Sequence, residues 1–189
     1  EIKGTLGKLY AKADRIDLGK EIARLNKIDL SDTAITLLMN DTTTNKDTTS
    51  TAVNWKLMLD QIDLDRVAFA MQIPGDSLRL STYIDKAGLT DGIVDLGSAR
   101  YSASQFLLSG SSLSYDGSYS DPAPGFDPAH IALNDVNIRI DSLLYGGRDI
   151  SARIKKFSAN DRSGLTLSSL TGDISSDSTT IQVLSLIHI

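Results

Sequence analysis

Apolar and polar residues alternate along most of the chain, and the alternation slips by one residue at recurring points. The segment "WKLMLDQIDLDRVAFAM" (Trp55–Met71) shows both features, because its phase slips after Leu64 and the apolar positions continue from Val67. A period of two residues is typical of a β-strand that has one apolar face. The pattern therefore predicts a mainly β protein, and it raises the question of what covers the apolar face.

The slip belongs to a ten-residue frame that recurs along the chain. Clear copies are "IDLSDTAITL" (Ile28–Leu37), "IDLDRVAFAM" (Ile62–Met71) and "IALNDVNIRI" (Ile131–Ile140), and "AGLTDGIVDL" (Ala87–Leu96) is a weaker one. Apolar or small residues fill positions 1, 3, 6, 8 and 10, and polar residues fill positions 4 and 5. Two structures explain the slip: a two-residue hairpin turn between paired strands, or a β-bulge within one strand. Either one keeps all five apolar positions on the same face.

The spacing of the frames suggests a repeating architecture. The clear copies begin 34 residues (28 to 62) and 69 residues (62 to 131) apart, close to one and two units of equal length. Periods of this size are typical of stacked supersecondary units. The spacing therefore favours an elongated sheet with little helix over a single closed globule.

Further strands follow from the same signals. Alternating apolar residues run from Leu78 to Ile84 after the turn signal "PGDS" (Pro74–Ser77), and again from Ile150 to Ile154. The segment "GKEIARLNKI" (Gly19–Ile28) has fair helix propensity, but it lies between two "IDL" triplets and we interpret it as strand.

Two segments are expected to be loops. Asn40–Thr51, "NDTTTNKDTTST", is polar and of low complexity, which is typical of a mobile excursion between strands. Tyr119–Pro128 holds three of the four prolines, which predicts an ordered turn or crossover.

Composition excludes several classes of function. The chain has 189 residues and a formal net charge of −5, and its basic residues form no cluster, which argues against nucleic-acid binding. It has no run of about 18 apolar residues that would span a membrane. The absence of cysteine excludes disulfide scaffolds, thiolate metal sites and cysteine nucleophiles.

No constellation of residues predicts an enzyme, a cofactor site or a metal site. The serines of "SGSSLSYDGSYS" (Ser109–Ser120), Ser111 among them, are interpreted as the solvent face of a strand, and the Gly-x-Ser-x-Gly motif is absent. The aspartates are spread through turn-like positions, where they usually bond their own backbone, so no pair of catalytic carboxylates is predicted. His130 is interpreted as structural, because the chain has no cysteine and its other histidine, His188, lies in the last six residues, so no zinc-ligand set is formed.

Both ends of the sequence suggest a fragment of a much larger protein. The chain starts at Glu1, already inside the alternating pattern, so a signal peptide cannot be sought. The last six residues, "LSLIHI" (Leu184–Ile189), resemble the translation of a sequencing adapter. A native final strand is the alternative, because the alternation also continues from Ile181.

Longer segments resemble the TamB translocation and assembly module family, in particular its long Bacteroidetes-type members. The resemblance rests on Trp55–Tyr101, which includes "PGDSL" and "DLGSARY", and on Phe126–Val183, which includes "HIALNDVNIRIDSL" and "RSGL". The opening Gly4–Asp32 is similar to the strand repeats of the same proteins. The resemblance covers the chain except for Asn40–Thr51 and the tail.

The resemblance implies a fold, a location and partners. It implies AsmA-like repeats that form an elongated, curved antiparallel β-sheet with an open apolar groove. The protein would be periplasmic and anchored in the inner membrane by a part outside this sequence. The resemblance further implies phospholipid transport between the inner and outer membranes. The implied partners are phospholipid acyl chains and, through other parts of the protein, an outer-membrane barrel of the TamA type that supports outer-membrane assembly.

Alternation and resemblance together predict which residues line the groove. Alternate apolar residues on successive strands form a surface without directional bonds, which suits a lipid chain. The predicted lining is Trp55, Leu57, Leu59, Ile62, Leu64, Val67, Phe69, Met71, Leu78, Leu80, Ile131, Leu133, Val136, Ile138 and Ile140. The alternative is a structural or binding β-solenoid or sandwich of the cell envelope or exterior, in which the same residues pack as a dry core.

Overall fold

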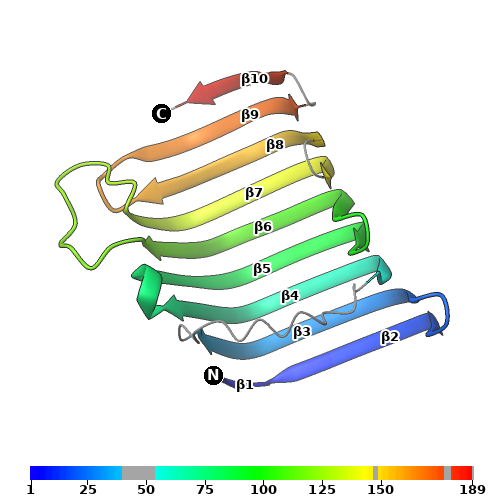
Figure 1. The fold of residues 1–189 in the computed structure, drawn as a ribbon. Coiled ribbons are helices and arrows are strands. Elements are labelled where there is room, and N and C mark those ends of the chain that lie inside the picture. The colour runs from blue at the N-terminus through cyan, green and yellow to red at the C-terminus, as the bar shows by residue number, and fades with distance from the viewer. Residues whose placement is uncertain (40–53, 147–148, 177–179, 189) are drawn as a thin grey trace.

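The computed structural model describes residues 1–39, 54–146, 149–176 and 180–188, which form one open sheet of ten strands (Figure 1). The sheet runs in the order β1-β3-β4-β5-β6-β7-β8-β9-β10, and β2 also pairs with β3. The elements are β1 (Ile2–Thr5), β2 (Lys8–Asp17), β3 (Ile22–Leu38), β4 (Lys56–Ile73), the 3₁₀ turn η1 (Pro74–Asp76), β5 (Leu78–Asp95), β6 (Arg100–Asp116), β7 (His130–Gly146), β8 (Asp149–Asp161), β9 (Thr166–Ser176) and β10 (Ile181–His188).

The expected mainly β, open and largely antiparallel sheet is confirmed. The segment Gly19–Ile28 forms a turn and the start of β3, as the strand interpretation predicted. Pro74–Ser77 is the turn between β4 and β5, where Ser77 adopts φ 56° and its backbone N–H donates to the carbonyl of Pro74. Tyr119–Pro128 lies between the antiparallel neighbours β6 and β7. The predicted loop Asn40–Thr51 falls outside the described residues.

The phase slip inside the frame is a bulge, and the hairpin explanation is wrong. β3, β4, β5 and β7 each continue through the polar pair at positions 4 and 5 without turning back. The residue at position 5 takes a left-handed conformation in all four frames, with φ between 49° and 53°: Asp32, Arg66, Asp91 and Asp135. One residue in this region re-aims the strand while the flanking apolar residues stay on one face.

The 34-residue spacing is the register of a parallel strand pair. β3 and β4 are the one parallel pair among the described strands, and each residue of β3 lies beside the residue 34 positions later, as Ile28 does beside Ile62. The 69-residue spacing does not correspond to a strand register. β7 runs antiparallel to its neighbour β6, and Ile131 pairs with Tyr115 at the end of that strand. The repeat therefore aligns two strands side by side rather than defining a unit that stacks throughout.

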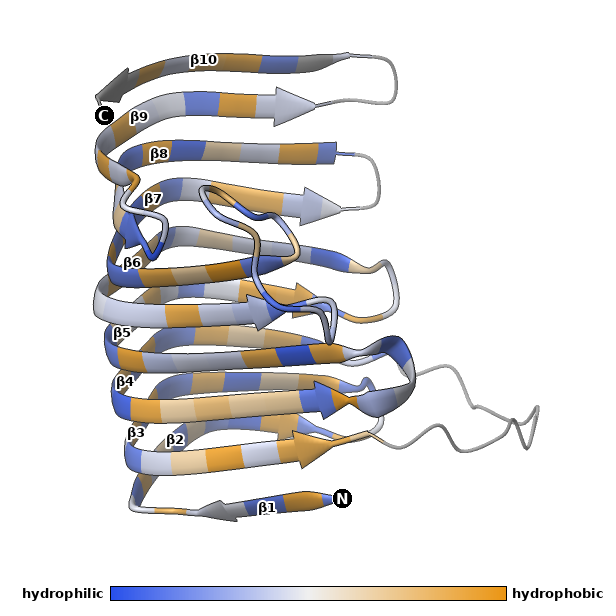
Figure 2. Cartoon of the chain, turned by 90° about the vertical axis from the view of Figure 1, so that its left-hand side faces the viewer, coloured by the Kyte–Doolittle hydropathy of each residue, from blue (hydrophilic) through white to orange (hydrophobic). Residues whose placement is uncertain are grey.

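Each long strand has bulges at two points along its length, and these divide it into three segments. The sheet bends at both points and so forms a trough. In β4, for example, Asp60 and Arg66 drop out of the otherwise regular pairing with β5. Figure 2 shows the result, in which each long strand turns from a front limb to a rear limb at the left of the view. On β3 to β7 we name three parts: wall A (33–38, 67–73, 78–84, 111–116 and 130–133), the floor (28–30, 62–64, 87–89, 106–108 and 136–140) and wall B (22–25, 56–59, 92–95, 100–103 and 143–146).

Most of the buried residues of β3 to β7 lie where the walls meet the floor. At the corner with wall A, Thr33, Val67, Ser111 and Val136 are all almost fully buried. At the corner with wall B, Leu59 and Ala103 are buried on either side of Gly92. A Cβ atom on Gly92 would sit 2.6 Å from Leu89 Cδ2 and 3.3 Å from Leu59 Cβ, so a larger residue at this bend would require the Leu89 side chain to move. The closely packed part of the protein is thus two narrow rows, not a continuous core.

Candidate functional site: an apolar groove

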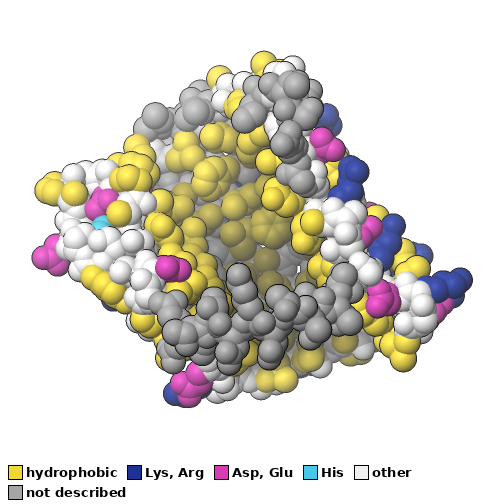
Figure 3. All heavy atoms as spheres, viewed as in Figure 1, with side chains coloured by type: hydrophobic (Ala, Val, Ile, Leu, Met, Phe, Trp, Pro, Cys, Tyr) yellow, Lys and Arg dark blue, Asp and Glu magenta, His cyan; other side chains and the backbone are white. Residues whose placement is uncertain are grey.

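The inside of the trough is a hollow lined with hydrophobic side chains. Figure 3 looks into this hollow and shows hydrophobic atoms across its centre, with charged side chains at the periphery. The pairing explains this arrangement, because rows of apolar residues continue from strand to strand. One row on the floor, for example, runs through Ile62, Leu89, Phe106 and Ile140. We call the surface formed by the inward-facing residues of wall A, the floor and wall B the groove.

The structure brings the predicted lining residues onto this one face. Trp55 directly precedes β4, and its carbonyl accepts a hydrogen bond from the N–H of Leu96. The members on wall B are Leu57 and Leu59; those on the floor are Ile62, Leu64, Ile138 and Ile140; those on wall A are Val67, Phe69, Met71, Leu78, Leu80, Ile131 and Leu133; Val136 lies at the corner.

Most of these residues are only partly covered by other protein atoms. Leu59, Val67 and Val136 are buried in the corners, whereas the other twelve predicted residues keep part of their surface exposed. A packed interior would bury such side chains almost completely. Within the described part of the chain, the groove is therefore a partly exposed apolar surface.

No charged side chain faces the groove from the described residues of β3 to β7. Charges occupy the alternate, outward positions and pair there. Lys27 Nζ lies 3.1 Å from Asp29 Oδ1 and 3.8 Å from Asp63 Oδ2, and Arg139 Nε lies 3.7 Å from Asp141 Oδ1. These exposed pairs contribute little to stability, but they identify the outer face as the one in contact with water.

The outer face of wall A carries small side chains. A shallow depression of about 300 Å³ crosses β3 to β7 there, and two adjacent rows line it, with Ala34 beside Ala68 and Thr36 beside Ala70. The large apolar residues of the same strands, such as Phe69, alternate with these and face inward. On wall A the two faces of the sheet thus differ, and the large aliphatic side chains and Phe69 are on the groove side.

Sequence reasoning was wrong about Ser111. Its interpretation as a solvent-facing serine is contradicted, because Ser111 is 1% exposed and lies at the corner between Val67 and Val136 in the row of buried residues. Its hydroxyl donates to the carbonyl of Ser109 (3.1 Å) and accepts from the backbone N–H of Asp85 (3.3 Å). The hydroxyl thereby satisfies backbone groups that the bulge frees.

Thr33 uses its hydroxyl in the same way on β3. Its Oγ1 donates to the carbonyl of Ser31 (3.0 Å) and accepts from the N–H of Gly7 (3.2 Å). In both cases the hydroxyl is at position 6 of a frame and bonds the carbonyl at position 4. The segment "FLLSGSSLSY" (Phe106–Tyr115) is such a frame, with Gly110 at position 5 and φ 59°, and the serine at position 6 concealed it.

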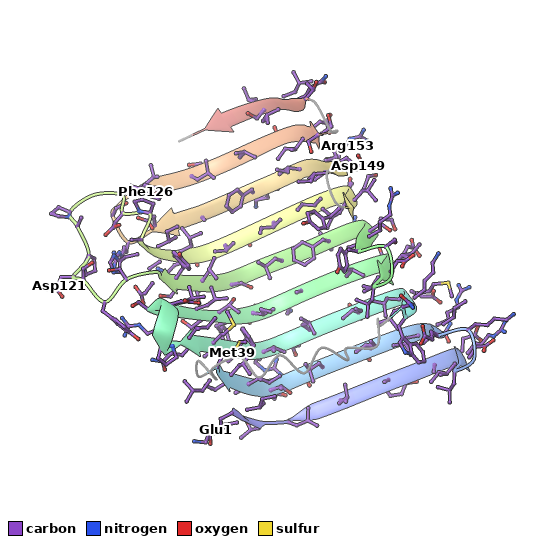
Figure 4. The ribbon with its side chains drawn as sticks, in the orientation of Figure 1. Glu1, Met39, Asp121, Phe126, Asp149 and Arg153 are labelled. Carbon is purple, nitrogen blue, oxygen red and sulfur yellow. The ribbon has the colours of Figure 1, made fainter. Side chains whose placement is uncertain are left out.

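His130 is a buried structural residue outside the groove. It is 3% exposed, and its Nδ1 lies 3.0 Å from Oδ2 of Asp127. The Asp127 carboxylate also accepts the backbone N–H groups of Ala123 and Ala129, and these bonds, with His130, lower the pKa of Asp127 to about 2. Asp127 thus organises the loop between β6 and β7, which projects beyond wall A and exposes Phe126 (Figure 4).

The described residues bring together no group of three or more histidine, cysteine, aspartate or glutamate side chains that could hold a metal ion. They also include no helix with the length and apolar character required to cross a membrane. No protein-family model matches the chain, and no curated protein matches it.

Proposed function

We propose that this chain is a segment of a bridge-like protein of the bacterial periplasm that carries phospholipid along the groove between the inner and outer membranes. The observation that carries the proposal is the continuous, partly exposed apolar face of β3 to β7, from which no charged side chain of the described residues projects. The TamB-like sequence segments support the same function. An inner-membrane anchor and a TamA-type barrel partner belong to the proposal and lie outside this sequence.

The energetics of the groove suit an acyl chain. Each methylene that leaves water for an apolar surface contributes about 0.8 kcal/mol, so a groove lined by aliphatic side chains compensates for much of the cost of leaving a bilayer. An acyl chain has no polar group to satisfy. A peptide segment lying along the same surface would need partners for its backbone N–H and C=O groups, which inward-facing aliphatic side chains do not supply.

Binding without chemistry is also the function that the side chains favour. The groove holds no titratable group other than tyrosine, so it offers no general acid or base of the usual kinds. The alternative of a dry, packed core is less well supported, because twelve of the predicted lining residues remain partly exposed.

Crosslinking from both faces of the sheet tests the proposal. A photoreactive amino acid is placed at Leu57, Phe69 or Ile138 in bacteria that export the chain to the periplasm. Matched controls carry it at the outward-facing neighbours, Lys56, Ala70 and Arg139. We expect phospholipid adducts at the three inward positions and few at the controls. Equal adduct yields on the two faces, or adducts to protein alone, would refute the proposal.

A further inference from the structure

Among the described residues of β3 to β7, tyrosines occupy the mouth of the groove on β6 and β7 alone. The last inward-facing row of wall B runs through Leu57, Val94, Tyr101, Tyr145 and Ile150. The last complete row of wall A runs through Leu37, Met71, Leu80, Tyr115 and Ile131. In these two rows the residues of β3, β4 and β5 are aliphatic or methionine, whereas β6 contributes a tyrosine to each wall.

The two tyrosines of wall B form a pair whose hydroxyl groups are free. The ring centroids of Tyr101 and Tyr145 lie 5.9 Å apart with the planes tilted by 31°, and the residues are 37% and 47% exposed. Neither hydroxyl makes a hydrogen bond within the described part of the chain. On the opposite wall, the Tyr115 hydroxyl reaches back to the strand end, where a Cβ atom on Gly117 would lie 2.5 Å from it.

A tyrosine at such a boundary suits an amphiphilic ligand. Its ring is apolar and its hydroxyl needs a polar partner, which is why tyrosine concentrates where one end of a side chain is dry and the other is wet. The groove floor below, with Phe106 and Leu108 on β6, is apolar. An acyl chain on the floor would place the polar end of the same molecule at the height of the tyrosines.

The polar group that the tyrosines meet lies on the inside of the trough. Arg100, next to Tyr101, takes the alternate, outward position and lies 4.0 Å from the Asp149 carboxylate of β8, with both side chains about half exposed. Among the described residues of β3 to β7, the groove face therefore presents no cation to a phosphate. A phenol hydroxyl instead donates well to a neutral carbonyl oxygen, such as that of an acyl ester.

We infer that Tyr101, Tyr115 and Tyr145 form a resting station at β6 and β7 for the ester-bearing glycerol region of a diacyl phospholipid, whose acyl chains lie on the floor. The inference rests on the proposed function and adds the place along the groove where the lipid is held. The mouth of β3 to β5 has aliphatic residues, Met71 and, before β4, Trp55, but no tyrosine among its described residues, so a lipid passes there. The tyrosine hydroxyls of β6 and β7 hold its ester carbonyls.

Two labelled phosphatidylcholines test the station with the purified full chain. One carries a diazirine on the acyl chain next to the ester, and the other carries it at the terminal methyl. After illumination, we expect the first label on peptides from the ends of β6 and β7 and the second on floor peptides. Replacement of all three tyrosines with phenylalanine should reduce labelling by the first lipid about fivefold, the equivalent of a hydrogen bond of about 1 kcal/mol.

The matched control replaces two exposed tyrosines of the outer face, Tyr10 and Tyr83, with phenylalanine and should leave both patterns unchanged. Unaltered ester-proximal labelling in the triple variant, or equal labelling at the ends of β4 and β5, would overturn the station but not the groove. If neither label is incorporated and copies of the chain pair through the groove instead, both proposals fail.

Discussion

The buried hydroxyl of Ser111 provides the sharpest test of how the sheet bends. In Ser111→Ala, the backbone N–H of Asp85 and the carbonyl of Ser109 both lose a partner in a position that is 1% exposed. A hydrogen bond contributes about 0.5–1.5 kcal/mol, and a buried group left without a partner costs about 1–3 kcal/mol. The distances of 3.1 and 3.3 Å place both bonds in the weaker half of that range. We expect Ser111→Ala to lower the free energy of unfolding by about 2 kcal/mol.

Urea unfolding followed by far-ultraviolet circular dichroism measures this loss, which corresponds to a midpoint shift of about 1 M. Ser112→Ala is the matched control, since this neighbour faces outward and its side chain makes no hydrogen bond in the described structure. It should change stability by less than about 0.5 kcal/mol. If the two variants unfold at the same urea concentration, the account of the corner hydroxyl is wrong.

Three further predictions concern the bends and the loop. Ser142 has φ 60°, so Ser142→Gly should stabilise the chain by up to about 1 kcal/mol and Ser142→Val should destabilise it. Thermal unfolding measures both changes, and the opposite order of stability would contradict backbone strain at this bulge. Asp127→Ala should accelerate hydrogen exchange in residues 117–129. Because the folded pKa of Asp127 is lowered to about 2, the difference from the parent should be full above about pH 5, shrink as the pH falls below about 4 and be lost as the pH falls through about 2. An undiminished difference at pH 2 would exclude this carboxylate as its cause. Arg66→Ala removes the exposed pair with Asp32 (2.7 Å) and should cause a smaller loss than Ser111→Ala, one that disappears in 1 M salt.

The sequence was sufficient to predict the apolar face because that face depends on local periodicity. Alternation and the polar pair at positions 4 and 5 place Leu64 and Val67 on one side whether the chain turns or bulges. The choice between these two depends on backbone pairing with neighbouring strands, which is not a local property. Asp32 and Arg66 at φ near 50° carry no signal as clear as a glycine.

Features that arise from register could not be predicted. Tyr101 and Tyr145 are 44 positions apart and meet only because β6 and β7 pair with a particular offset. The frame on β6 was missed because Ser111 is polar in an apolar position, and its burial depends on a hydrogen bond from β5. The 34-residue period corresponds to the register of a parallel pair instead of a stacked unit, because β3 and β4 run in the same direction.

An environment-sensitive fluorophore on the groove tests the central claim most directly. The chain has no cysteine, so a single cysteine at Phe69 can be labelled selectively, with Ala70→Cys as the outward-facing control. If the groove is open and binds acyl chains, the label at position 69 should be dim in buffer and brighten with phosphatidylcholine vesicles, while the label at position 70 stays dim. A label at position 69 that is bright without lipid and unchanged by vesicles would show a packed core and contradict the groove.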